Sequence, residues 1–291
     1  MLKKLIKYEW RETWKMGLII LLAIAGITLV GTLGVVLPVN YIQSRNLGNT
    51  TGTMSAGFMS LMLTMSAMLY VVTFVGVNYG MLIYQGLRFY KTMYSEEGYL
   101  THTLPVTPKQ LLFSKTFVAG IWYLLVGLGI ILSIGILIGT LFGSLMNTGA
   151  MRDLSQILRE MERTMELDES YLFSLIHGII YMIAVVIIKP FSKMMILFGC
   201  LTVGQLSKKY KAFMGILVYI GVWFANSIVN STVKYIFTAL SDKAYMANNQ
   251  AMSNFLMVFG SSDMTLLILL GLAVGFYYLS CFLLNKKLNL E

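Results

Sequence analysis

The sequence predicts an all-α polytopic membrane protein with six transmembrane helices, and three observations predict this fold class. Hydrophobic residues make up 57% of the 291 residues and charged residues only 12%, whereas charged residues make up about 25% of a soluble domain. Six stretches contain no charge, and each has at least the roughly 17 residues that the shortest spanning helices use. The apolar residues do not alternate in short segments, as they do in a membrane β-barrel. The uncharged stretches are 16–44, 46–87, 116–151, 171–188, 212–233 and 264–285.

We place one span at each stretch. The first apolar run is too long for a signal peptide and lacks a small-x-small cleavage site after it, so we expect it to be retained. The predicted spans are about Met16–Leu37, Met54–Tyr84, Thr116–Gly143, Tyr171–Gln205, Phe213–Val233 and Thr265–Leu284.

Residues 1–15, which precede the first span, have an amphipathic pattern. This pattern predicts a helix that lies in the inner membrane interface, with its tryptophans at the depth of the headgroups. The alternative is an ordinary basic flank of the first span. Leu2, Leu5, Ile6, Trp10 and Trp14 fall near one helical face, and Lys3, Lys7 and Arg11 fall on another.

The distribution of basic residues predicts the orientation. Cytosolic segments of membrane proteins are rich in Lys and Arg, and this rule places both termini in the cytosol. The loop 144–170 then lies outside, and its part from Met151 to Ser170 carries six acidic residues: Asp153, Glu160, Glu162, Glu166, Asp168 and Glu169. Most of the basic residues flank the spans, so the net charge of +9 indicates membrane orientation and not nucleic-acid binding.

Two predicted spans carry glycines four residues apart. The third span contains Gly135, Gly139 and Gly143, and the sixth contains Gly271 and Gly275. Glycines at this spacing share a helix face and let another backbone approach closely. They indicate helix packing, either within one protomer or between two.

The chain lacks the motifs of common enzymes and metal sites. It has only two histidines, no His-Glu-x-x-His pair and no Gly-x-Ser-x-Gly elbow, and its two cysteines, Cys200 and Cys281, fall in predicted spans. It also lacks a phosphate-binding loop of the form Gly-x-x-x-x-Gly-Lys-Ser/Thr. We therefore expect no catalytic residue, metal or cofactor in this chain, and if the chain moves a solute against a gradient, we expect the energy to come from another polypeptide.

A charged segment, residues 85–115, separates the second span from the third. Ser95 is positioned to cap a short helix that starts at Glu96, because acidic residues favour a helix N-terminus. Thr107 is positioned to cap another, with Pro108 at its first position and Gln110 at the capping-box position. With the predicted orientation, this segment is cytosolic.

In this segment the chain resembles the permease subunits of ABC-2-type ATP-binding cassette exporters. The resemblance rests on Glu97-Gly98-Tyr99-Leu100, followed by Thr103-Leu104-Pro105-Val106-Thr107 and by Lys115 at the start of the third span. Thr202-Val203-Gly204-Gln205-Leu206 with Lys208 and Lys209, the six-span layout and the N-terminal helix agree with it. The resemblance implies a single permease domain over 1–291 without a nucleotide-binding domain.

The resemblance also implies a coupling helix between the second and third spans that binds a groove of the ATPase subunit. Glu96, Glu97, Tyr99, Leu100 and His102 become candidate contacts, and Lys208 and Lys209 form a smaller second contact. The alternative is a solvated loop whose Leu-Pro turn merely caps the third span.

Polar residues in the fourth and fifth predicted spans indicate a substrate path. The fourth span, Tyr171–Gln205, contains Lys189, Pro190 and Lys193, and we expect Pro190 to kink or break the helix. A rival interpretation divides this region into two short spans. In the fifth span, Asn226 and Asn230 recur on one face with Lys234. We expect Lys189, Lys193, Asn226 and Asn230 to line an outward exit; the alternative is snorkelling lysines and hydrogen bonds between helices.

These observations predict a transport subunit and not an enzyme. It would act in a bacterial-type cell membrane with an ABC ATPase subunit, which would bind ATP and Mg, and with a second permease copy or a paralogue. The resemblance favours amphipathic or hydrophobic cargo, such as an antimicrobial peptide, a bacteriocin or a peptide toxin. Drug or lipid export by the same family is an alternative, and so are an ATP-independent channel or secondary transporter and a structural membrane protein.

Overall fold

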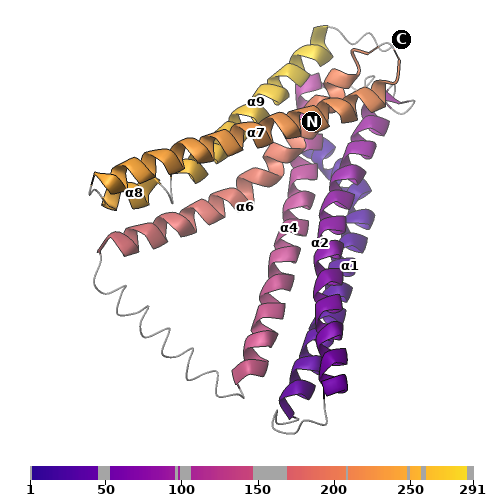
Figure 1. Ribbon diagram of the computed structural model, residues 1–291. Coiled ribbons are helices and arrows are strands. Elements are labelled where there is room, and N and C mark those ends of the chain that lie inside the picture. Colours follow the sequence, from indigo (N-terminus) through magenta and orange to yellow (C-terminus); the bar gives the residue numbers. More distant parts are fainter. Residues whose placement is uncertain are drawn as a thin grey trace. The chain divides into compact units, whose positions relative to one another are not determined.

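The structure is a computed structural model that describes residues 2–44, 53–95, 98, 106–146, 169–207, 209–247, 250–256 and 260–286. The regular elements in these ranges are helices (Figure 1). All of them except the short α8 are long and apolar enough to cross a membrane, so the predicted all-α class and its six spanning helices are confirmed. The helices are α1 (Leu2–Ser44), α2 (Thr53–Tyr94), α4 (Pro108–Met146), α6 (Glu169–Gly204), α7 (Lys211–Met246), α8 (Gln250–Phe255) and α9 (Ser261–Lys286).

The N-terminal segment differs from the expected separate interfacial helix. Residues 2–15 form the first turns of α1, which runs through the first predicted span as one helix of 43 residues. A helix of this length measures about 65 Å, roughly twice the thickness of the hydrocarbon core. The charged residues among 2–15 mark the edge of the apolar region. These residues include no glycine or proline, and the helix continues through this edge.

The start of α4 agrees with the predicted cap. α4 begins at Pro108, the backbone N–H of Gln110 donates to Thr107 Oγ1 at 3.4 Å, and the N–H of Leu111 donates to the Thr107 carbonyl at 3.1 Å. The helix continues without a break through the third predicted span, so the second of the two short helices expected here is the first part of α4. The helix expected at Glu96 and Glu97 lies outside the described residues.

α6 accommodates Pro190 within a single helix. It has 36 residues from Glu169 to Gly204, so the rival interpretation of two short spans is wrong, and the expected break at Pro190 does not occur. Proline is tolerated in spanning helices because neighbouring groups satisfy the backbone carbonyl that it leaves unpaired. Pro190 is itself buried in the protein.

The chain forms two compact units. Unit 1 contains residues 1–12, 82–124 and 175–291, and unit 2 contains residues 13–81 and 125–174. In unit 1, the ring of Phe89 in α2 stacks on Phe198 in α6 with centroids 4.1 Å apart, and α7 packs beside α9 (Figure 1). In unit 2, α1 and α2 approach closely where Gly31 meets the ring of Tyr70.

The glycine pattern of the third and sixth spans does not produce close packing within the described part of the chain. A Cβ atom added at Gly135, Gly139, Gly143, Gly271 or Gly275 would meet nothing within 4 Å. The close approaches occur elsewhere. At Gly199 of α6, an added Cβ would lie 2.7 Å from the Cβ of Phe276 in α9. The spaced glycines of the third and sixth spans therefore make no close helix contact among the described residues. Their packing between protomers stays a prediction.

Candidate functional site

The predicted ATPase contacts are mostly not described. Glu96, Glu97, Tyr99, Leu100, His102 and Lys208 all lie outside the described residues. Lys209 is exposed in the turn between α6 and α7, where its carbonyl accepts a hydrogen bond of 2.7 Å from Ser207 Oγ. The next residue, Tyr210, has a φ of 57°, the left-handed conformation, and directly precedes α7. This turn is compact, and it presents Lys209 to the surface.

Gly98 is the one described residue between Ser95 and Val106, and it is buried. Its backbone N–H donates to the Ser95 carbonyl at 2.7 Å. An added Cβ at this position would lie 2.6 Å from the carbonyl oxygen of Met93. The glycine of the Glu97-Gly98-Tyr99-Leu100 motif therefore lets the chain fold back against the end of α2.

A cluster of ion pairs joins three helices of unit 1 on either side of this segment. Glu9 of α1 uses both carboxylate oxygens: Oε1 accepts from Lys115 Nζ of α4 at 2.6 Å, and Oε2 accepts from Arg88 Nη2 of α2 at 2.7 Å. Lys115 Nζ also donates to Thr92 Oγ1 at 2.9 Å, and Arg88 Nη2 lies 2.8 Å from Glu12 Oε2. We call Glu9, Glu12, Arg88, Thr92 and Lys115 the Glu9 cluster.

The Glu9 cluster is largely withdrawn from solvent. The side chains of Lys115, Arg88 and Glu9 are 5%, 12% and 14% exposed, whereas that of Glu12 is 65% exposed. Two acidic and two basic side chains balance one another. When one partner of a buried pair is removed, the other charge is left uncompensated, which typically costs about 3–5 kcal/mol. The three least exposed members, Glu9, Arg88 and Lys115, are therefore interdependent.

The sequence analysis did not identify the Glu9 cluster, although a signal for it exists. Glu9 lies on the same helical face as Ile6, Trp10 and Thr13, which the fold turns inward. Trp10 stacks on the buried Trp122 of α4, with centroids 4.9 Å apart. An acidic residue on the apolar face of an amphipathic helix requires a cationic partner inside the protein, and this requirement could have singled out Glu9.

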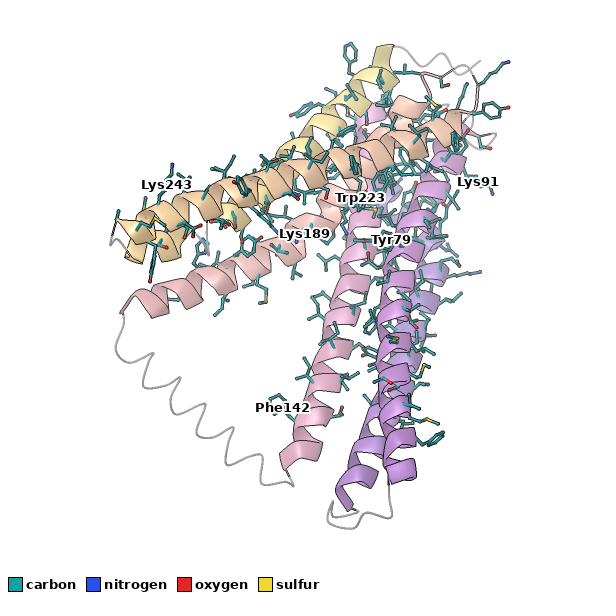
Figure 2. All side chains as sticks on the ribbon, viewed as in Figure 1. Tyr79, Lys91, Phe142, Lys189, Trp223 and Lys243 are labelled. Carbon is teal, nitrogen blue, oxygen red and sulfur yellow. The ribbon has the colours of Figure 1, made fainter. Side chains whose placement is uncertain are left out.

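The lysines of the predicted substrate path lie in α6, within unit 1. Lys193 Nζ donates to the hydroxyl of the buried Tyr123 in α4 at 3.3 Å and lies 5.5 Å from the centroid of its ring. Lys189 is an exposed residue of the same helix, one turn before Lys193 (Figure 2). The structure thus places both predicted lysines in α6 and joins Lys193 to α4 through Tyr123.

Asn226 and Asn230 lie on the inward face of α7. One turn before Asn226, Val222 packs against a buried cluster of Ile196, Cys200 and Ala273. The Oδ1 atoms of both asparagines are buried and have no hydrogen-bond partner among the described residues. The asparagines therefore continue the packed face of α7 as two polar positions, but no hydrogen bond links them to Lys189 or Lys193.

Two further polar contacts involve residues with no predicted role. In unit 1, His177 Nε2 of α6 lies 3.2 Å from Asp263 Oδ2 of α9. In unit 2, Ser133 of α4 is hydrogen-bonded to Thr28 of α1 and to the hydroxyl of Tyr70 in α2. The described part of the chain holds no group of three or more His, Cys, Asp or Glu side chains that could bind a metal ion.

The chain matches no family model, no curated protein and no solved structure.

Proposed function

We propose that this chain is the membrane-spanning subunit of an ATP-driven exporter of the ABC-2 type. The observation that carries the proposal is the sequence from Glu97 to Thr107, which resembles the coupling segment of those permeases and joins α2 to α4. Six helices able to span a membrane, and the capped start of α4 directly after this segment, support it. The chain lacks a phosphate-binding loop, so the ATPase is a separate subunit.

The proposed orientation places both termini and the segment 85–115 in the cytosol of a bacterial-type cell. Lys3, Lys4, Lys7 and Arg11 near the N-terminus, and Lys208, Lys209 and Lys211 between α6 and α7, then lie on the cytosolic side. The acidic loop 144–170 lies outside. This arrangement follows the bias of basic residues towards the cytosol.

ATP binding would close a pair of ATPase subunits, and the coupling segment would transmit that movement to the membrane helices. The partner subunit would hold ATP and Mg, and this chain would supply no catalytic group. A second copy of the chain, or a paralogue, would complete the transporter. Glu96, Glu97, Tyr99, Leu100 and His102 would contact the ATPase, with Lys208 and Lys209 as a second contact.

The proposed cargo is an amphipathic or hydrophobic peptide that passes Lys189, Lys193, Asn226 and Asn230. A cation costs several kcal/mol in the middle of a bilayer, so polar groups in a span usually face a path or the protein interior. The two buried asparagine oxygens, which have no hydrogen-bond partner among the described residues, support a polar path in this part of unit 1. Drug or lipid export would use the same residues.

Copurification tests the proposal. A tagged chain, expressed in its native cell and extracted in mild detergent, should elute with a protein that contains a phosphate-binding loop and hydrolyses ATP. Reversing Glu96 and Glu97 to Lys should abolish this association. Reversing Glu160 and Glu162 to Lys is the matched control, because this pair is predicted to lie outside. If the Glu96 and Glu97 variant kept the ATPase, the coupling assignment would fail; if the unmodified chain eluted with no ATPase, a channel or secondary transporter would replace the proposed function.

A further inference from the structure

Glu9 of α1 binds both α2 and α4, the two helices that the proposed coupling segment connects. The segment leaves α2 after Tyr94 and enters α4 at Pro108. Glu9 Oε2 binds Arg88, less than two turns before the end of α2, and Glu9 Oε1 binds Lys115, two turns after the start of α4. One carboxylate of α1 thus bridges both flanks of the segment.

We propose that Glu9 is the positioning residue through which movement of the coupling segment reaches α1. The inference rests on the proposed function, since it requires an ATPase that moves the segment. The ion pairs measure 2.6 and 2.7 Å, and their cationic partners are 5% and 12% exposed, so separating the three helices at this point would leave poorly solvated charges unpaired. Because Glu9 lies within the first turns of α1, a displacement at Glu9 moves the part of α1 that belongs to unit 1, residues 2–12.

Glu12 provides a comparison that distinguishes the bridging role of Glu9 from simple pairing with Arg88. It lies one turn from Glu9 on the same helix and contacts the same atom, Arg88 Nη2, at 2.8 Å. Its side chain is 65% exposed, and exposed pairs are worth only about 0–1 kcal/mol. Glu12 has no bond to Lys115 in the described structure, so it contacts one flank of the segment only. Glu12→Gln is therefore the matched control for Glu9→Gln.

The first part of the experiment measures thermal unfolding of the purified chain in detergent. Glu9→Gln leaves the buried Lys115 without a carboxylate partner and leaves Arg88 with only the exposed Glu12, so the midpoint should fall by about 10 °C. Glu12→Gln should change it by no more than about 2 °C. Adding Lys115→Met to Glu9→Gln removes the unpaired cation and should restore most of the loss. Equal effects of Glu9→Gln and Glu12→Gln would overturn the inference, because the bridge would then contribute nothing.

The second part uses the stable double variant Glu9→Gln/Lys115→Met in complex with the ATPase. A cysteine replaces either His102, in the segment, or Tyr8, an exposed residue of α1 next to Glu9. The reaction rate of each cysteine with a maleimide is measured before and after the ATPase is trapped with ADP and vanadate. In the unmodified background and in Glu12→Gln, both rates should change. In the double variant, the rate at position 102 should still change, and the response at position 8 should be lost.

The outcomes separate the inference from the proposed function. If position 8 still responds in the double variant, Glu9 is merely a structural residue and the inference fails while the proposed function stands. If neither position responds in the unmodified background, no movement passes from an ATPase to this chain, and both fail. The native cysteines Cys200 and Cys281 are buried, and the chain without an added cysteine gives their background.

Discussion

At the scale of single residues, the effect of a glycine on helix packing depends on how closely a neighbouring helix approaches it. Gly199 and Gly139 are both helical glycines, but their surroundings differ. An added Cβ at Gly199 would lie 2.7 Å from the Cβ of Phe276, which cannot move without its backbone, whereas one at Gly139 would meet nothing within 4 Å. The two positions therefore form a natural pair for comparison.

We predict that Gly199→Ala destabilises the chain and that Gly139→Ala does not. Overpacking in a close helix contact typically costs about 1–3 kcal/mol, and α6 and α9 must separate to admit the new methyl group. Thermal unfolding of the purified chain in detergent checks this. Gly139→Ala should match the unmodified protein or be slightly more stable, since alanine favours helices more than glycine does. Equal destabilisation by both changes would show that the α6–α9 contact is not as described.

The residue scale is also where the sequence analysis predicted least. It placed Lys189, Lys193, Asn226 and Asn230 on faces of their own helices, because helical periodicity reveals which residues share a face. It could not find the contact of Lys193 with Tyr123, which joins α6 to α4, because periodicity within one helix carries no information about the register between two helices. The pattern could have singled out Glu9 but not its partners, for the same reason: they lie 79 and 106 residues away.

At the scale of helices, the chain uses few local signals, and Thr107 supplies one of the clearest. It caps α4 where the proposed coupling segment ends, through its hydroxyl and its carbonyl. Thr116, two turns later in the same helix, donates its hydroxyl to the Leu112 carbonyl at 2.8 Å instead. A hydroxyl that bonds back to the preceding turn does not replace a missing helix bond. Thr107 therefore caps the helix, whereas Thr116 does not.

We predict that Thr107→Val lowers stability by about 1 kcal/mol, the usual effect of losing an N-cap. Thr116→Val, the same substitution in the same helix, should cost less than Thr107→Val, because the Thr116 hydroxyl does not replace a missing helix bond. Chemical unfolding of the purified chain provides the comparison. If the two variants were equally stable, the hydroxyl of Thr107 would not act as the cap of α4.

The existence of the spanning helices could be predicted, but their ends could not. Long uncharged stretches identify helices because lipid requires every backbone polar group to be satisfied internally. Charged residues mark the edges of the membrane, yet they do not end a helix, which continues past such an edge. For this reason α1 includes residues 2–15, which the sequence suggested as a separate helix. Thr107 and Pro108 were predicted correctly because a cap is encoded by adjacent residues.

At the scale of the whole molecule, the account depends on which side of the membrane each connection occupies. We predict that a cysteine introduced at Glu160 reacts with an impermeant maleimide in intact cells. A cysteine at Lys208 should react only after the membrane is permeabilised, because the bias of basic residues places it in the cytosol. Reaction at Lys208 in intact cells, with protection at Glu160, would invert the orientation and remove the proposed coupling segment from the side where ATP is available.

The central claim is that the segment between α2 and α4 binds an ATPase, and site-specific photocrosslinking in living cells tests it most directly. A photoreactive amino acid at Leu100 should form an adduct with a protein that contains a phosphate-binding loop. The same group at Tyr245, an exposed residue at the C-terminal end of α7, should form no such adduct. Failure to capture an ATPase from Tyr99, Leu100 and His102 alike, in a chain that reaches the membrane normally, would contradict the account.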